Sequence, residues 1–221
     1  MIEENLKTLL EQIPKTNPFG EKVTLVGAVK TQTVESINRA ICAGLSDIGD
    51  NHVQEFKEKF DRIEGDPKRH FIGHLQTNKV KYLLGKVDLY HSLDRMSLGE
   101  ELSKRGHNAG VVSDILVQIN IGNEESKSGF DISEAEKACA ALSSLPALKV
   151  RGLMAMLPDT DDEEKLRRLA TLMRKKFDGL KPLYDGFDYL SMGMSGDWKL
   201  CIECGSNMIR LGTAIFGSRQ Y

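Results

Sequence analysis

The sequence predicts an α/β protein built as a single (β/α)8 barrel of the TIM type, with an extra helix at the N-terminus. Short apolar runs alternate with amphipathic stretches eight times along the 221 residues, the pattern of a parallel sheet covered by helices. No linker, low-complexity tract or shift in composition divides the chain, so one domain is expected over residues 1–221. A doubly wound open sheet is the alternative, and the lack of a G-x-G-x-x-G motif after the first strand weakens its dinucleotide-binding version.

The first half of the chain carries an opening helix and four predicted strands. The strands are expected at 23–30, in a run that ends at Asn51, at 70–74 and at 87–92. They are short and apolar, and the first is rich in β-branched residues, as buried strands are. Helices are marked by apolar residues at helical spacing, namely Leu6, Leu9, Leu10 and Ile13, then Val34, Ile37 and Ile41, then Val53, Phe56 and Phe60, then Val80 and Leu83, and last Leu98 and Leu102. Thr33 and Thr77 are placed to cap the second and fourth of these helices, and Gly44 to end the second.

The second half repeats the pattern with four more strands. They are expected at 113–120, 148–155, 187–192 and 208–216. Ser133 with Glu136 predicts a capping box for the helix after the fifth strand. The longest helix is predicted from about Asp161 to Leu180. Its apolar face consists of Leu166, Leu169, Ala170, Met173 and Phe177.

Composition narrows the classes of function. A formal charge of −2 gives no reason to expect nucleic acid or anionic lipid as a partner, and no apolar run has the length of a membrane span. The acidic, amphipathic N-terminus does not resemble a signal or transit peptide. Four cysteines in a chain of this size suggest a reducing compartment, so a cytoplasmic protein is expected. The protein is also expected to be a monomer.

In a barrel, the carboxyl ends of all strands face one mouth, where chemistry is usually located. The residues that the predicted strands bring there are Lys30, Asn51, His74, Ser92, Asn120, Met154 and Ser191. A lysine at the rim of an apolar strand can attack a carbonyl through its neutral amine, although the strand alone is explained better by a solvated lysine. His74, Ser92 and Met154 are further candidates for contacts with a bound group. His74 is either a base or a rim histidine bonded to backbone.

Two polar turns follow the seventh and eighth strands, the usual phosphate site of this fold. Ser195 and Gly196 are expected to open a helix whose free N–H groups attract an anion. Gly212 allows close approach of the backbone, and Thr213 adds a hydroxyl donor. Each turn is a weak signal, but together they indicate a phosphate corner. A lysine across from that corner suggests a phosphorylated aldehyde held as a Schiff base.

Nearly the whole chain resembles one known family in order. The matching segments are Leu-Val-Gly-Ala-Val-Lys30, Ile-Gly-Asp-Asn51, His70-Phe-Ile-Gly-His-Leu-Gln-Thr-Asn78-Lys, His91-Ser-Leu-Asp94, Val-Gln-Ile-Asn120-Ile-Gly, Glu-Glu-Ser-Lys127-Ser-Gly129, Arg151-Gly-Leu-Met-Ala-Met156, Leu190-Ser-Met-Gly-Met-Ser-Gly-Asp197 and Ile209-Arg-Leu-Gly-Thr-Ala-Ile-Phe-Gly217. The chain is identified by them as a member of the YggS/PROSC family of pyridoxal phosphate homeostasis proteins. The resemblance implies a barrel like the N-terminal domain of alanine racemase, the type III fold of pyridoxal phosphate enzymes, without the C-terminal β-domain.

The resemblance also implies roles for individual residues around pyridoxal 5′-phosphate. Lys30 matches the Schiff-base lysine. The phosphate contacts match Ser195, Gly212 and Thr213, with Gly196 beside them; Arg210 matches an arginine near the pyridine ring, and Asn51 a polar group close to the cofactor. This chain departs from the family pattern at Ala28-Val29 before the lysine, at Asp50 before Asn51, and at Trp198, Cys201 and Cys204.

Three functions compete at this point. The first is a carrier that holds pyridoxal phosphate reversibly in intracellular homeostasis and delivers it to apoenzymes that the sequence does not identify. The second is an amino-acid racemase or a related enzyme of weak activity; racemization needs a second base from a further domain, which is not expected here, and an arginine at the ring weakens the cofactor as an electron sink. The third is a barrel enzyme acting on a sugar phosphate.

The Cys201–Cys204 pair and Lys127 can each be interpreted in two ways. Cys201-Ile-Glu-Cys204 resembles a metal or redox pair, but without other ligands nearby in the sequence it is better explained by helix packing, and no metal is expected. Lys127 is either a solvated charge or a second amine near the mouth.

Overall fold

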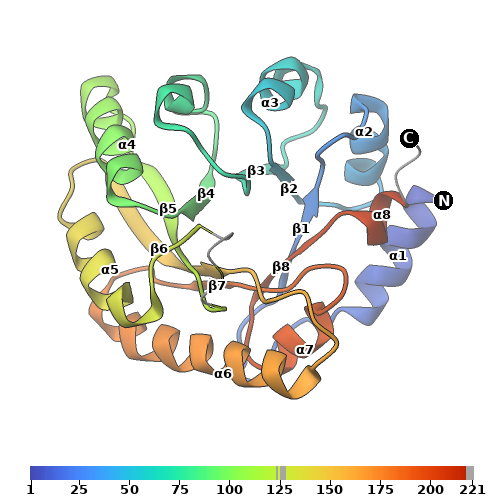
Figure 1. Ribbon diagram of the computed structural model, residues 1–221. Coiled ribbons are helices and arrows are strands. Elements are labelled where there is room, and N and C mark those ends of the chain that lie inside the picture. Colours follow the sequence, from blue (N-terminus) through green and yellow to red (C-terminus); the bar gives the residue numbers. More distant parts are fainter. Residues whose placement is uncertain (123, 125–127, 218–221) are drawn as a thin grey trace.

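The computed structural model describes residues 1–122, 124 and 128–217, and within them eight parallel strands form a closed barrel in sequence order with helices outside (Figure 1). The strands are β1 (Thr24–Ala28), β2 (Asp47–Asp50), β3 (Lys68–Phe71), β4 (Leu89–Leu93), β5 (Ser113–Ile119), β6 (Leu148–Ala155), β7 (Tyr189–Ser191) and β8 (Met208–Leu211). Pairing of Thr24 with Met208 and of Gly27 with Leu211 closes the barrel between β1 and β8. The predicted barrel is therefore confirmed, and the open sheet is wrong.

The helices lie around the outside of the barrel (Figure 1). The α-helices are α1 (Ile2–Gln12), α2 (Val34–Cys42), α3 (Val53–Lys59), α4 (Met96–Ala109), α5 (Ala135–Ser143), α6 (Glu163–Leu180), α7 (Trp198–Glu203) and α8 (Thr213–Phe216). Four 3-10 helices add η1 (Phe60–Arg62), η2 (Thr77–Tyr82), η3 (Ile132–Glu134) and η4 (Lys181–Leu183). The extra N-terminal helix α1 lies beside α8, where Asn5 Nδ2 donates to the carbonyl of Ile215 at 3.1 Å.

Several predicted boundaries hold and others are wrong. Thr33 caps α2 as expected, because its hydroxyl accepts the N–H of Ser36 at 3.2 Å. Thr77 does not cap the next short helix: it is the first residue of η2, and Gln76 precedes it as N-cap. The capping box at Ser133 is also wrong. Asp131 takes the N–H and the hydroxyl of Ser133 instead, at 2.7 and 2.5 Å, and α5 continues from η3.

Two strands end earlier than predicted because glycine redirects the chain. β3 stops at Phe71, and the following Gly73 lies so close to the backbone of Asn51 that a Cβ at Gly73 would be 2.0 Å from the Asn51 carbonyl oxygen. β8 stops at Leu211, because the Gly212 carbonyl accepts the N–H groups of the next turn and begins α8. His74 therefore lies beyond its strand.

The core has an inner and an outer part. The inner cluster consists of Val26, Leu89, Leu116, Met154 and Met208, on five strands of the barrel. Larger clusters between the barrel and its helices bury most of the remaining Leu, Ile and Phe side chains. Over the described ranges, none of the helices combines the length and the hydropathy that crossing a membrane requires.

Candidate functional site: the barrel mouth and a buried polar chain

Lys30 lies two residues beyond the end of β1, at the carboxyl end of the barrel. Its side chain is half-buried, and among the described residues nothing accepts a hydrogen bond from its ammonium group. The next residue, Thr31, has a φ of +63°, which is rare for a β-branched side chain and costs energy. Strain of this kind persists only where surrounding contacts enforce it.

Two residues of α3 supply those contacts. Glu55 Oε2 accepts the N–H of Thr31 at 2.7 Å and the ammonium of Lys59 at 2.8 Å. Lys59 also donates to the carbonyl of Val29 at 3.3 Å. Because the backbone is held on both sides of Lys30, the direction of its side chain is set by α3. Sequence analysis did not assign these two residues a role, although their i,i+4 spacing predicts an ion pair.

The turns after β7 and β8 meet as predicted. Thr213 Oγ1 lies 3.1 Å from Ser195 Oγ, and both residues are exposed. A Cβ on Gly212 would be 3.4 Å from the carbonyl oxygen of Ala28, so this corner adjoins the end of β1. The corner therefore offers two hydroxyl groups near the strand that carries Lys30.

One detail of the corner differs from the prediction. Ser195 and Gly196 do not open a helix but form a turn before α7, whose N-cap is Asp197. The carboxylate of Asp197 accepts the N–H of Met194 at 2.6 Å, which closes the turn. The anion-attracting groups of the corner are thus hydroxyls and turn amides, not the N-terminus of a long helix.

Arg210 of β8 points into the barrel interior and is buried. Its Nη1 donates to the hydroxyl and, at 3.0 Å, to the carbonyl of Ser191, and its Nη2 donates to the carbonyl of Ala155 at 3.0 Å. Burial lowers the pKa of Arg210 to about 10, so the guanidinium is still a cation at neutral pH. The described residues leave its Nε without an acceptor.

A chain of buried polar groups continues from Ser191 through the barrel interior. His91 Nδ1 lies 3.1 Å from Ser191 Oγ, His91 Nε2 lies 2.9 Å from His70 Nδ1, and His70 Nε2 lies 3.0 Å from Asp47 Oδ1. Because the Asp47 carboxylate at one end can only accept and arginine at the other can only donate, neutral histidines require Ser191 to accept from Arg210 and to give its own proton to His91. His91 then donates from Nε2 to His70, which donates from Nε2 to the Asp47 carboxylate. All five groups are satisfied with one direction of donation and both histidines neutral.

The pKa shifts agree with this assignment. Burial, together with the nearby His70 and the Arg210 cation, holds the pKa of His91 well below its usual value. Burial raises the pKa of Asp47, but hydrogen bonds from His70 and from Ser46, at 2.6 Å, outweigh it and the net pKa is lowered. An anion and a cation thus lie at opposite ends of a chain of neutral groups. Asp47, His70 and His91 were not among the functional candidates predicted from the sequence, although polar residues inside apolar strands are a signal of an internal network.

The other predicted mouth residues have different surroundings. His74 is exposed, and its Nδ1 bonds the Asp94 carboxylate at 2.9 Å rather than backbone, so the backbone alternative is wrong. Ser92 is buried and donates to the carbonyl of Gly73. Asn120 Nδ2 donates to the Glu124 carbonyl at 2.9 Å.

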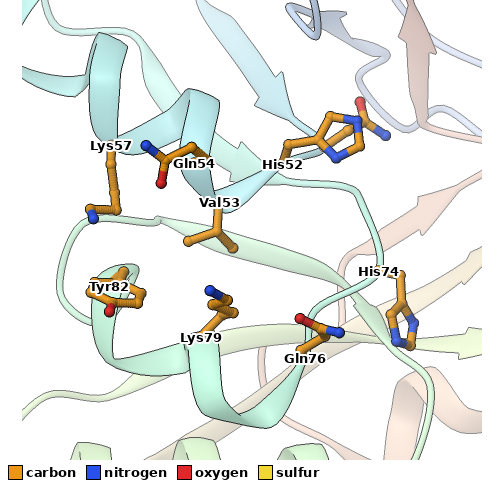
Figure 2. A pocket seen from close by; sticks show the side chains of 9 residues that line it. His52, Val53, Gln54, Lys57, His74, Gln76, Lys79 and Tyr82 are labelled. Carbon is orange, nitrogen blue, oxygen red and sulfur yellow. The ribbon is translucent and has the colours of Figure 1, made fainter.

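A pocket of about 360 Å³ lies beside the mouth, between α3 and η2 (Figure 2). It is lined by Asn51, His52, Val53, Gln54, Lys57, His74, Gln76, Lys79 and Tyr82. Among the described residues, none of those lining it is a carboxylate. Asn51 belongs both to this pocket and to the end of β2, and its buried Oδ1 has no hydrogen-bond partner within the part of the chain that the structure describes.

The remaining candidates give no sign of a metal or redox site. Cys201 and Cys204 are free, buried thiols, and burial raises the pKa of Cys201 well above its usual value, which disfavours the reactive thiolate. Among residues 1–122, 124 and 128–217, no group of three potential metal ligands occurs. Lys127 lies outside the described residues.

Comparison with known proteins relates the whole chain to one family. Residues 2–220 match the family described as the alanine racemase N-terminal domain. The pyridoxal phosphate homeostasis protein of Aquifex aeolicus (strain VF5) is 41% identical over 224 residues, covering 99% of this chain and 98% of the relative. The protein of the same name from Escherichia coli (strain K12) is 38% identical over 205 residues, 91% and 88% of the two chains. The structure of PipY from Synechococcus elongatus PCC7942 with PLP bound superposes with a TM-score of 0.85 at 29% identity, over 98% of this chain and 100% of that one.

Proposed function

Because this chain belongs to the family of pyridoxal phosphate homeostasis proteins, we propose that it binds pyridoxal 5′-phosphate reversibly and acts in the homeostasis and delivery of this cofactor. The observation that carries the proposal is the meeting of the Ser195–Thr213 hydroxyl pair with the end of β1, next to Lys30. The PLP-bound structure of PipY supports the choice of ligand.

The described residues fit this cofactor. A phosphate group finds two hydroxyl donors and a close-approach glycine at Ser195, Thr213 and Gly212. A ring nitrogen finds the unengaged Nε of Arg210, which remains a donor. An aldehyde finds the amine of Lys30, which has no competing partner among the described residues. Asn51, with its buried unpartnered Oδ1, lies at the neighbouring strand end.

Lys30 is proposed to hold the cofactor as a Schiff base. With the cofactor present, the ε-amine would condense with its aldehyde, forming a carbon–nitrogen double bond and releasing one water, and hydrolysis would reverse this. Glu55 and Lys59 fix the backbone on both sides of Lys30, so this part of the backbone does not need to be ordered when the cofactor enters. Pre-organisation of this kind reduces the entropic cost of binding.

Arg210 is one observation that favours a carrier over a racemase. With the cofactor bound, a guanidinium beside the ring nitrogen would disfavour protonation there, and the pyridinium is the form that best withdraws electrons. On the rim, His74 with Asp94 is the base candidate that the structure describes; the carboxylate holds its Nδ1 at 2.9 Å and leaves Nε2 without a partner among the described residues, so the deuterium-exchange measurement below decides whether it acts as a base. The four free cysteines support the expected reducing, cytoplasmic location.

Two measurements test the binding site. Lys30→Ala should abolish the adduct trapped by borohydride without unfolding the protein, because one half-buried rim side chain contributes little to the core. An adduct that persists at another lysine as the main product would reject the assignment. Ser195→Ala/Thr213→Val should weaken cofactor binding well over tenfold, since each charge-assisted bond contributes about 1.5–3 kcal/mol and about 1.4 kcal/mol is a factor of ten.

A third measurement separates carrier from enzyme. Purified protein loaded with pyridoxal phosphate is incubated with L- and D-alanine in D₂O, and deuterium at the α-carbon is followed. Negligible exchange, together with transfer of the cofactor to an added apoenzyme, is the expected result. Exchange and inversion at many turnovers per second that disappear in Lys30→Ala would establish a racemase instead.

A further inference from the structure

The pocket between α3 and η2 contains two ammonium groups without counter-charges. Lys57 from α3 and Lys79 from η2 reach toward the same aromatic ring, with their Nζ atoms 4.3 and 5.9 Å from the centroid of Tyr82 (Figure 2). Lys81 adds a third ammonium 5.0 Å from that ring. Within the described part of the chain, none of the three has a carboxylate within 4.0 Å.

The carboxylates that α3 carries, Glu55 and Glu58, form no ion pair with these three lysines. Glu55 holds Thr31 and Lys59, and Glu58 accepts a hydrogen bond from Gln54 at 2.6 Å. Cations that converge without an acid repel one another, and a ring face compensates each of them by only about 0.5–1 kcal/mol at an exposed site. The pocket therefore has a positive potential that an anion would relieve.

The neutral groups of the pocket are suited to hydrogen bonding. Gln76 and His52 supply donors and acceptors around the lysines, Gln54 supplies its amide oxygen because its Nε2 is bonded to Glu58, and Asn51 also lines the pocket. A ligand with an anionic group would satisfy the lysines, and its other polar atoms could bond these neutral side chains. Since two ammonium groups line the pocket, a dianion matches their charge better than a single carboxylate.

We propose that this pocket is a second anion site, separate from the Ser195–Thr213 corner, that binds the phosphate group of a small phosphate monoester beside the barrel mouth. The site itself follows from Lys57, Lys79 and Asn51. Only the identification of the ester with pyridoxal phosphate that is entering or leaving rests on the proposed function, because Asn51 connects the pocket to the end of β2 at the mouth.

The test uses ¹⁵N-labelled protein without cofactor, titrated with inorganic phosphate and, in a matched series at equal ionic strength, with acetate. Phosphate should move the amide signals of Val53 and Val80 at the pocket, and separately those of Gly196 and Ala214 at the corner. Lys57→Gln/Lys79→Gln should raise the phosphate Kd at the pocket at least about tenfold and leave the Kd at the corner unchanged. The control Lys104→Gln/Lys137→Gln removes the same charge from exposed positions on α4 and α5 and should leave both Kd values unchanged.

Three results would overturn the anion site: pocket signals that do not respond to phosphate, an equal response to acetate, or equal weakening in the two double variants. A silent corner with a responsive pocket would reject the proposed cofactor site and keep this one. Addition of pyridoxal phosphate beyond one equivalent decides the source. Movement of Val53 and Val80 assigns the pocket to the cofactor, and their failure to move overturns that identification.

Discussion

Replacement of Ser191 by alanine tests the direction of the buried polar chain with the loss of a single oxygen atom. Ser191 Oγ accepts from Arg210 Nη1 and donates to His91 Nδ1 at 3.1 Å. Without it, the fully buried His91 Nδ1 has no donor, which costs about 1–3 kcal/mol. Arg210 loses one bond but keeps the Ser191 carbonyl at 3.0 Å, for a further cost of about 1 kcal/mol.

While both histidines are neutral, the chain has no inexpensive way to adapt to that loss. If His91 moved its proton to Nδ1, its Nε2 would face the acceptor Nδ1 of His70. If His70 changed tautomer as well, its lone pair at Nε2 would face the Asp47 carboxylate. Asp47 therefore fixes both histidines, and Ser191→Ala should lose about 2–4 kcal/mol of the free energy of unfolding.

Urea unfolding at pH 7 measures this loss. With a slope of about 2 kcal/mol per molar, the midpoint should fall by about 1–2 M. Ser144→Ala is the matched control, because Ser144 is exposed on α5's last turn and bonds only the Ala141 carbonyl at 2.7 Å; its change should stay within about 0.5 kcal/mol. A Ser191→Ala variant as stable as Ser144→Ala would refute the reasoning. The double variant Asp47→Asn/Ser191→Ala should lose less free energy of unfolding than the two single variants lose in total. The reason is that an amide at position 47 can donate to His70 and let the histidine tautomers change.

Three further perturbations probe other parts of the structure. Glu55→Gln weakens the acceptor that holds Thr31 at positive φ, so cofactor affinity should fall about 3- to 10-fold in a spectroscopic titration; unchanged affinity would remove Glu55 from the site. Burial raises the pKa of Asp50 to about 6, so the native state binds more protons than the unfolded state between about pH 4 and 6. The free energy of unfolding should therefore fall by up to about 3 kcal/mol as the pH rises through this range. Asp50→Asn should abolish this pH dependence in urea titrations, and a persistent dependence would assign it to another group. Burial opposes ionisation of Glu21, but hydrogen bonds, chiefly from Arg174, outweigh it and lower the pKa of Glu21 to about 2. The Glu21–Arg174 pair therefore stabilises the fold above about pH 4.5, and this stabilisation is lost as the pH falls toward 2. Glu21→Gln should destabilise the protein at pH 7 and be neutral near pH 2, and equal losses at the two pH values would contradict an ionic origin.

Sequence patterns located the strands and helices because periodicity is a local property. They failed where a competing side chain nearby, or a contact with a distant segment, decides the local structure. Asp131 competes for Ser133 and displaces the capping box, and Asp197 closes the turn at Ser195 that was expected to begin a helix. The end of β3 depends on contact between Gly73 and the loop after β2, which no window of sequence contains.

The candidate site divides in the same way. Lys30, Ser195 and Thr213 could be proposed from sequence, because a parallel barrel brings all strand ends to one mouth. The chain from Asp47 to Ser191 could not, since its members are separated by 20 residues or more and meet only through the register of neighbouring strands. Whether a polar strand residue faces the interior is decided by that register.

Closure of the barrel between β1 and β8 has a consequence for synthesis of the protein. Thr213 leaves the ribosome more than 180 residues after Lys30, which at about 5–20 residues per second is a delay of roughly 10–40 s. During that interval β1 has an unpaired edge, and the hydroxyl corner beside it has not yet been made. A nascent chain therefore cannot capture a phosphate group at this corner, so occupancy of the corner reports that β8 has docked and the barrel is closed.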